Sequence, residues 1–208
     1  MTWVPRTLDD VCHPDHSALL VYDMQVGIRS QLKGADVIVA RCAEAIAAAR
    51  AAGMRVVYTR HLSCSRPWMG VTQVRTAMAW QRTDDPQAVN PWFQRGSPGA
   101  EIVPELAPAA DDMVFDKLAM SAFEGTPLAF ALRDCGLTGV AICGIATEIG
   151  VAPTVLHATD LGFVPVVIED ACGAGNDVAG TRAIEAMRFV GEALVTDVGS
   201  FAAAIASA

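Results

Sequence analysis

Apolar runs alternate along the chain with segments whose apolar residues recur at helical spacing. Residues 17–24, SALLVYDM, form a near-continuous apolar run, which is typical of a strand buried on both faces of a sheet. Residues 36–53 follow with helical spacing, and Gly53 stands where a glycine commonly ends a helix. The pattern therefore opens with a strand and a helix.

The same alternation continues toward the end of the chain. Residues 126–136 predict a helix with Thr126 as its N-cap and Pro127 at its first position. Five more apolar runs predict strands at residues 54–60, 111–117, 139–145, 163–170 and 192–198. Alternating strands and helices predict βαβ units with right-handed crossovers, and hence a six-stranded parallel sheet in one domain covering residues 1–208.

One long segment departs from this rhythm. Residues 61–108 hold three of the four tryptophans and many prolines, with a single helical pattern at residues 70–80. A segment of this length without regular structure is usually functional. We expect it to form a lid over the site or a contact between subunits.

Composition and charge narrow the class of protein. The formal net charge of -8 argues against nucleic-acid binding, which needs concentrated Lys and Arg. The sequence contains no run of 18 apolar residues, so we expect no membrane span. The N-terminal residues contain no apolar signal core. The six cysteines include no C-x-x-C pair, which favours free thiols without zinc. We expect a cytoplasmic protein that acts on a small molecule.

Charged and polar residues follow the predicted strands, at the edge where ligands bind in open parallel sheets. Asp23 directly follows the first strand, with Gln25 beyond it, and Lys117 ends the third. A half-buried aspartate has a tunable proton affinity, and a nearby lysine would make an acid–base pair with it. The alternatives are a helix-capping or turn aspartate and an exposed loop lysine in a weak surface ion pair.

The turn after the fourth strand reads GIATEIGVAP, residues 144–153. Proline is tolerated only in the first helical turn, so Pro153 predicts a helix that begins near Gly150. Residues 146–149 would then wrap around the strand end with their N–H groups aimed at an anion. The alternative is an ordinary loop in which Gly150 eases a tight bend.

These segments together resemble the isochorismatase-like hydrolases, also called cysteine hydrolases, over roughly residues 17–198. The resemblance is carried by LLVYDMQ, by VFDKLAMSAF and by CGIATEIGVAPTVLHATDLGFVPVVIEDAC, in that order. It implies a three-layer, doubly wound, Rossmann-like sheet of six parallel strands, with Asp23 and Lys117 as catalytic residues. It also implies a cis peptide bond at Ile145–Ala146 and assembly into a homodimer or homotetramer.

The sequence departs from the family at the nucleophile. The family's catalytic cysteine aligns with Gly150, while the N–H groups of Ala146 and Gly150 align with its oxyanion hole. Other thiols are poor substitutes, because Cys143 and Cys172 read as packing residues. Cys64, in the irregular segment, is a weak candidate for a reactive thiol. The D-x-H metal pattern of nicotinamidases is also missing, which leaves His61 alone and predicts no metal and no cofactor.

The favoured function is cofactor-independent, vinyl-ether-type hydrolysis of a small metabolite by the acid–base chemistry of Asp23 and Lys117, without a covalent cysteine. The true isochorismatases, which also have glycine at this position, cleave a vinyl ether by protonating carbon. Three alternatives stay open: hydrolysis of an amide, imide or ureide by directly activated water, a ligand-binding pseudoenzyme, and an engineered substitution at Gly150.

Five residues are predicted to bind the substrate. Gln25 and Thr147 stand at the strand ends, Arg60 offers a guanidinium for a carboxylate, and Phe123 and Trp92 are candidate pocket walls. Surface or core roles compete with each prediction. Similar candidates, weighed on the same grounds, are Arg75, Arg82, Arg95, Trp80 and Phe163.

Overall fold

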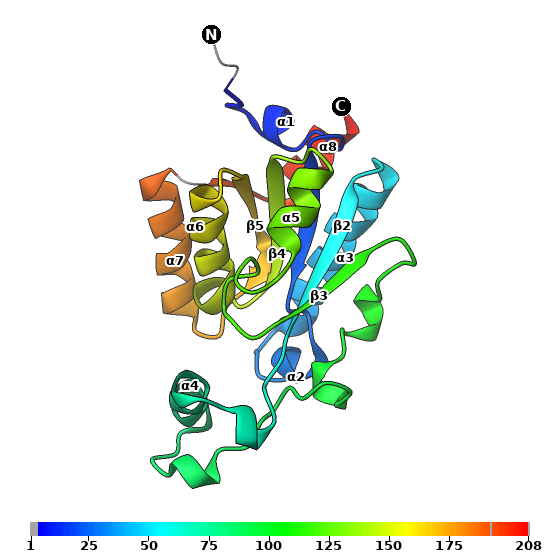
Figure 1. Cartoon of the computed structure of the whole chain (residues 1–208). Coiled ribbons are helices and arrows are strands. Elements are labelled where there is room, and N and C mark those ends of the chain that lie inside the picture. The colour runs from blue at the N-terminus through cyan, green and yellow to red at the C-terminus, as the bar shows by residue number, and fades with distance from the viewer. Residues whose placement is uncertain (1–3, 192, 208) are drawn as a thin grey trace.

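The structure, a computed structural model, describes residues 4–191 and 193–207, and its centre is a sheet of six parallel strands (Figure 1). The strand order is β3-β2-β1-β4-β5-β6, so the chain builds outward from β1 in one direction and then from β4 in the other. This order confirms the predicted doubly wound parallel sheet. The strands are β1 Ser17–Tyr22, β2 Arg55–His61, β3 Met113–Lys117, β4 Gly139–Ile145, β5 Val164–Gly173 and β6 Leu194–Thr196.

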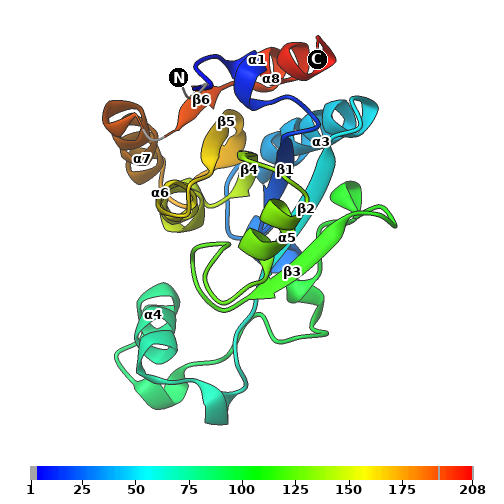
Figure 2. The same cartoon turned by 45° about the horizontal axis from the view of Figure 1, so that its top comes forward.

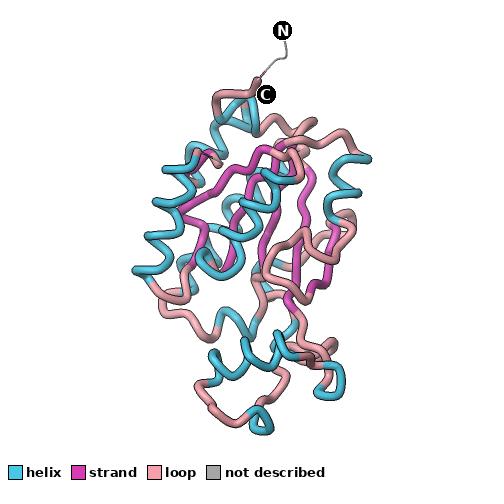
Figure 3. The backbone as a smooth tube through the Cα atoms, turned by 60° about the vertical axis from the view of Figure 1, so that its left-hand side comes forward, coloured by secondary structure: helices cyan, strands magenta, loops and turns pink. Residues whose placement is uncertain are grey.

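Helices cover both faces of the sheet and give the three layers predicted (Figures 1 and 3). On one face lie α1 Leu8–Val11, α3 Ala35–Ala51 and α8 Val198–Ala206. On the other face lie α5 Leu128–Asp134, α6 Ala152–Asp160 and α7 Asp177–Val190. The predicted helix at residues 126–136 is shorter in the structure, and its N-cap is Pro127 and not Thr126. Thr126 Oγ1 accepts a hydrogen bond from the N–H of Leu128, the first residue of the helix.

The central strand β1 has every residue buried, as its continuous apolar run predicts. Its side chains alternate between the two faces: Leu19 and Val21 belong to the core under α3 and α8. Leu20 and Tyr22 belong to the core under α5 and α6. Tyr22, the last residue of the strand, therefore points toward the helical layer of α5 and α6, on the side of the turn between β4 and α6.

The irregular segment between β2 and β3 projects away from the sheet and carries the helix α4 Val71–Gln81 (Figure 2). Four short 3₁₀ helices accompany it, and each has a proline in its first turn. These helices are η1 Arg66–Trp68, η2 Pro86–Ala88, η3 Pro98–Ala100 and η4 Pro104–Leu106. The segment returns to the sheet through an antiparallel bridge between Ile102 and Gln25, just before the short helix α2 Val26–Arg29.

Among the residues that the structure describes, no helix combines the length and apolar character needed to cross a membrane.

Candidate active site

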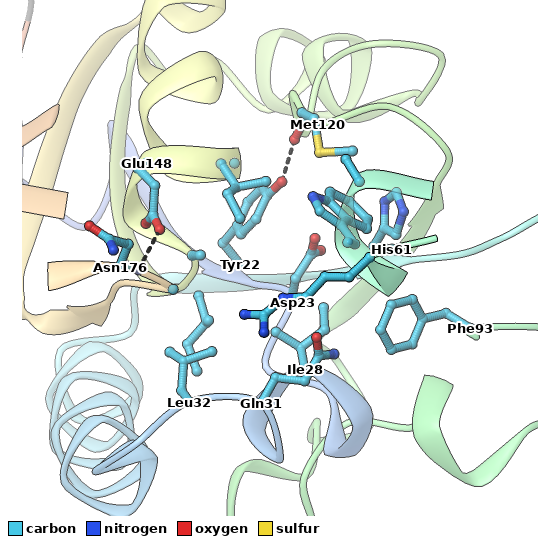
Figure 4. A pocket seen from close by; sticks show the side chains of 18 residues that line it. Tyr22, Asp23, Ile28, Gln31, Leu32, His61, Phe93, Met120, Glu148 and Asn176 are labelled. Carbon is cyan, nitrogen blue, oxygen red and sulfur yellow. Dashed lines mark hydrogen bonds between the residues drawn. The ribbon is translucent and has the colours of Figure 1, made fainter. Parts of the chain in front are cut away.

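A cavity of about 380 Å³ opens at the carboxyl ends of the strands (Figure 4). Its position matches the rule for open parallel sheets, because β1 and β4 are the neighbours at which the chain changes direction. Figure 4 shows Asp23 near the middle of the site, with Glu148 on one side and His61 on the other. The residues of its lining that bear on chemistry are Tyr22, Asp23, His61, Ala146, Glu148 and Gly150.

Asp23 stands in the first turn after β1, with its backbone in the left-handed region at φ 47°. Aspartate tolerates this conformation better than most residues. The side chain is buried, and both carboxylate oxygens accept hydrogen bonds. Thr59 Oγ1 donates to Oδ1 at 2.8 Å, and Lys117 Nζ donates to Oδ2 at 2.7 Å. The carboxylate is thus held in one orientation at the edge of the cavity.

Lys117 ends β3, and its side chain is completely shielded from solvent. Besides Asp23, its ammonium donates to Tyr22 Oη at 2.8 Å and to the carbonyl of Ala119 at 3.1 Å. An ammonium has three donors, and here all three are used. The proximity of Asp23 and Lys117 agrees with the sequence analysis, and the exposed surface pair considered there is wrong.

The loop after β3 contains Ser121, Ala122 and Phe123, and hydrogen bonds connect it to α6. The N–H of Ala122 donates to Thr154 Oγ1 at 3.0 Å, and Ser121 Oγ lies 2.9 Å from His157 Nδ1. These contacts hold the loop that carries Lys117 beside the turn that carries Gly150. Phe123 lies in the same loop, but its ring stacks on Phe163 in the core, so the predicted substrate contact does not fit its position.

Tyr22 fills the space above Gly150. A Cβ atom placed on Gly150 would overlap the hydroxyl oxygen and two ring carbons of Tyr22, well inside van der Waals contact. The hydroxyl donates to the carbonyl of Met120 and accepts from Lys117. Burial, reinforced by Asp23, raises the pKa of Tyr22 well above its usual range. The sequence analysis missed this residue because it ends an apolar strand and reads as core.

The turn after β4 differs from its predicted form. It follows a cis peptide bond at Ile145–Ala146 and is a π-helical turn, η5 Thr147–Val151, which runs directly into α6. The α-helix itself begins at Ala152, close to the predicted start near Gly150 and with Pro153 in its first turn, whereas the π-helical turn ahead of it was not predicted. The wide π turn provides i→i−5 bonds ahead of Pro153, so the proline constrains only the α-helical part.

One N–H group that was predicted to face an anion, that of Gly150, instead forms a hydrogen bond within the turn. The N–H of Gly150 donates to the carbonyl of Ala146 at 2.9 Å, and the N–H of Val151 donates to the same carbonyl at 3.1 Å. The predicted oxyanion role of Gly150 therefore does not fit this geometry. Ala146 lines the cavity, as predicted, and its role toward an oxyanion stays a prediction.

Two other predicted substrate contacts are structural. Gln25 is fully buried, and its amide donates to the carbonyls of His61 and Ala100, each at 3.0 Å. Its oxygen accepts from the N–H of His61, so the side chain joins β2 to the returning segment. Thr147 is buried and donates to the carbonyl of Gly173 at 3.1 Å. The strand-end position of both residues was informative, but their polar groups satisfy the backbone.

Arg60 and Trp92 lie outside the main cavity. Arg60 pairs with Asp116 at 2.8 Å and with Glu101 at 3.3 Å, so its guanidinium is neutralised away from the site. Trp92 lines a neighbouring cavity of about 260 Å³, which shares His61 with the main one. Of the other arginines considered, Arg82 lines the main cavity, whereas Arg95 pairs with Asp116.

His61 and Glu148 add hydrogen-bonding capacity to the main cavity. Burial, together with the charge of Lys117, lowers the pKa of His61, which keeps its imidazole neutral. Its Nδ1 and the Oε2 of Glu148 are buried without a hydrogen-bond partner among the described residues. The other oxygen of Glu148 accepts from the N–H of Asn176 at 2.8 Å (Figure 4). Unpaired buried acceptors are costly, so both atoms are candidates for contact with substrate N–H groups.

The described residues offer neither a reactive thiol nor a metal cluster at this site. Cys143 and Cys172 lie in the sheet; a hydrogen bond with Cys42 and burial raise the pKa of Cys143, and burial raises that of Cys172. Cys64 lies against Gln73 of α4. No group of three or more His, Cys, Asp or Glu residues in the described parts of the chain is arranged to hold a metal ion.

Comparison with known proteins gives one consistent result. Residues 17–199 match the family model described as the isochorismatase domain. Ureidoacrylate amidohydrolase RutB of Enterobacter sp. (strain 638) is 32% identical over 188 residues, covering 82% of this chain and 81% of that protein. The family match and this relative agree with the resemblance described above.

Solved structures extend the comparison. N-carbamoylsarcosine amidase from Thermoplasma acidophilum superposes with a TM-score of 0.71 at 26% identity, covering 88% of this chain and 96% of that one. A cysteine hydrolase from Pseudomonas syringae pv. phaseolicola 1448A gives a TM-score of 0.78 at 24% identity, with 94% of each chain covered. The second comparison supports the fold alone.

The contact between Gly150 and Tyr22 predicts a strong energetic coupling. Gly150→Ala should lower the free energy of unfolding by about 2 kcal/mol, because the added methyl group overlaps the buried phenol. Tyr22→Val is itself destabilising because the buried phenol is lost, but in that background Gly150→Ala should lower the free energy of unfolding by much less. Urea denaturation of the single and double variants measures the coupling.

Gly99→Ala is the matched control, since a Cβ there makes only ordinary van der Waals contact. A Gly150→Ala protein as stable as the Gly99→Ala control would contradict the steric coupling.

Burial of neutral His61 predicts a pH-dependent stability. An unfolded histidine titrates near 6.5, and the pKa of His61 is lower in the folded state. The unfolded chain then binds more protons below pH 6.5, so the free energy of unfolding should decrease as the pH falls from 6.5 toward the folded pKa. His61→Gln should remove this part of the pH dependence in denaturation curves between pH 5 and 8. The exposed His16, changed to Gln, provides the control.

Proposed function

Because the chain belongs to the isochorismatase family of hydrolases, we propose that it hydrolyses a small amide or ureide with a water molecule activated by Asp23. The observation that carries this proposal is the Asp23 carboxylate at the cavity, with donors on both of its oxygens. A carboxylate held in this way is suited to accept a proton from water. No covalent intermediate on cysteine is part of the reaction.

The geometry of Asp23 favours amide or ureide hydrolysis over hydrolysis of a vinyl ether. That reaction needs a protonated aspartic acid to deliver a proton to carbon. Both oxygens of Asp23 already accept hydrogen bonds, from Thr59 and from Lys117 at 2.7 Å, so neither is placed to carry a proton toward a substrate carbon. The glycine shared with the true isochorismatases is explained here by the space that Tyr22 needs, so Gly150 by itself does not favour an enol-ether substrate.

The lining of the cavity supports a substrate with N–H donors. Glu148 and neutral His61 bring acceptor atoms to opposite sides of Asp23, and a carbamoyl or amide group carries N–H groups to match them. Two proteins similar to this chain are named for substrates of this kind, ureidoacrylate and N-carbamoylsarcosine. Arg82 lines the same cavity and would receive a carboxylate on the substrate.

The assembly is a separate proposal. Trp68 and Val71 are 80% and 79% exposed on the projecting segment, which favours a contact between copies of the chain. We therefore propose that the chain forms a homodimer or homotetramer. The free cysteines favour a reducing compartment, and we propose the cytoplasm.

Turnover of a substrate panel tests the reaction class. We expect ureides and small amides to be hydrolysed and isochorismate to be left intact, as measured by release of ammonia or amine. Asp23→Asn should lower kcat/KM at least about 100-fold, because general-base catalysis is removed. Asp116→Asn is the matched control, since Asp116 ends near the same sheet edge but pairs with Arg60 and Arg95 outside the cavity. Hydrolysis of isochorismate alone would reverse the ranking, and tight binding of a panel compound without turnover would favour a binding protein.

Thiol alkylation tests the absence of cysteine chemistry. Iodoacetamide should modify exposed Cys135 and the partly exposed Cys64 while hydrolysis continues at its original rate. Mass spectrometry of the alkylated protein identifies the modified residues. Inactivation that parallels labelling of one cysteine, together with loss of activity when that cysteine is replaced by serine, would show that a thiol takes part.

A further inference from the structure

We propose that the phenol of Tyr22 is a third catalytic residue, which donates a proton to the leaving nitrogen of the substrate. The inference rests on the proposed amide or ureide hydrolysis and adds the group that this reaction still needs. Asp23 accepts a proton from the attacking water, but an amine leaves an amide carbon readily only after its nitrogen is protonated. A second group, within reach of the leaving nitrogen, must supply that proton.

The position of the Tyr22 hydroxyl supports this role. The oxygen lies in the volume that a side chain on residue 150 would occupy, as the overlap with a Cβ at Gly150 demonstrates. In relatives with a cysteine at that position, the reacting side chain starts from the same point. Tyr22 therefore brings a polar hydrogen to the place where the family keeps its reacting group, although it comes from β1 and not from the turn after β4.

The chemical state of the phenol supports a donor and not a nucleophile. Burial raises the pKa of Tyr22, so the neutral phenol dominates and the phenolate needed for attack on a carbonyl is disfavoured. In the free protein its hydrogen is directed to the carbonyl of Met120, which also lines the cavity. A substrate nitrogen that approaches beside Met120 offers the same hydrogen another acceptor.

Lys117 connects the two ends of the proton path. Its Nζ lies 2.7 Å from Asp23 Oδ2 and 2.8 Å from Tyr22 Oη, and 4.4 Å from the centre of the Tyr22 ring. When Tyr22 gives its proton to the leaving nitrogen, the ammonium returns one to the phenolate oxygen. Lys117 then takes up the proton that Asp23 removed from water.

The proton balance closes without a further reactant. The oxygen of water forms the new bond to carbon, the carbon–nitrogen bond breaks, and its electron pair stays on the leaving nitrogen. That nitrogen carries away the proton of Tyr22, while the proton from water passes through Asp23 and Lys117 to restore Tyr22. All three side chains end as they began.

A packing role alone leaves the hydroxyl unexplained. The ring by itself fills the space above Gly150, and a phenylalanine would do so without a buried polar group to satisfy. The hydroxyl instead joins Lys117 to the Met120 carbonyl at the cavity wall. Tyr58 offers a natural comparison, because its hydroxyl bonds to Arg50 on the opposite face of the sheet, away from the cavity.

The decisive experiment compares Tyr22→Phe with wild type on two substrates that share a carbamoyl group. One releases an alkylamine, which needs protonation, and the other is an aryl carbamate that releases 4-nitrophenolate, which does not. We expect Tyr22→Phe to lower kcat for the alkylamine substrate about 100-fold, to leave its KM within about 3-fold, and to change the aryl carbamate rate less than about 5-fold. Asp23→Asn should slow both substrates, and Tyr58→Phe should slow neither.

The outcomes separate this inference from the proposed function. Equal losses on both substrates would indicate that Tyr22 only supports the site, and unchanged alkylamine release in a folded Tyr22→Phe protein would also overturn its role as proton donor. In both cases hydrolysis by Asp23 still stands. If wild type turns over neither substrate, nor any other amide or ureide, then the proposed function fails and this inference fails with it. Circular dichroism and the melting temperature of each variant confirm that the fold is retained.

Discussion

The ion pair between Asp23 and Lys117 is the interaction on which the rest of the site depends. Both side chains are buried, and β2 lies in the sheet between their strands, β1 and β3. Thr59 of β2 donates the second side-chain hydrogen bond to the Asp23 carboxylate. Breaking such a pair by removing one partner costs about 3–5 kcal/mol, because the remaining charge is left without compensation. The pair therefore joins three strands at their carboxyl ends and fixes where a carboxylate meets the cavity.

The second constraint is steric, and it connects β1 to the turn after β4. Only glycine at position 150 leaves room for the phenol of Tyr22, so these two residues have to be understood together. Read from the sequence alone, Gly150 is a missing nucleophile. In the folded protein it is the partner of a side chain that approaches from the neighbouring strand. Set beside the cysteine that the family resemblance implies at this position, the proposed role of Tyr22 would exchange one reacting group for another that approaches from β1.

Local patterns predicted the parts of the protein that depend on local causes. Continuous apolar runs located the strands, and the order of elements gave the parallel sheet; charged residues directly after strands located Asp23 and Lys117. The missed features depend on contacts distant in sequence. Tyr22 has the same apolar neighbours as any core residue, and only Gly150, 128 positions later, reveals the space it occupies. Gln25 and Thr147 were read as substrate contacts, but backbone groups of other segments satisfy them.

The same Asp–Lys pair can serve a thiol and a phenol in opposite ways. A thiol with an ordinary pKa near 8.5 becomes a useful nucleophile when a neighbouring base removes its proton. A buried tyrosine resists that loss much more strongly, since its pKa starts near 10 and rises with burial. The phenol is therefore better suited to donate a proton, which the neighbouring ammonium of Lys117 can then replace. An exchange of thiol for phenol would then move the attack from the protein to water, while Asp23 would still accept the proton of the nucleophile and Lys117 would return a proton to the phenol.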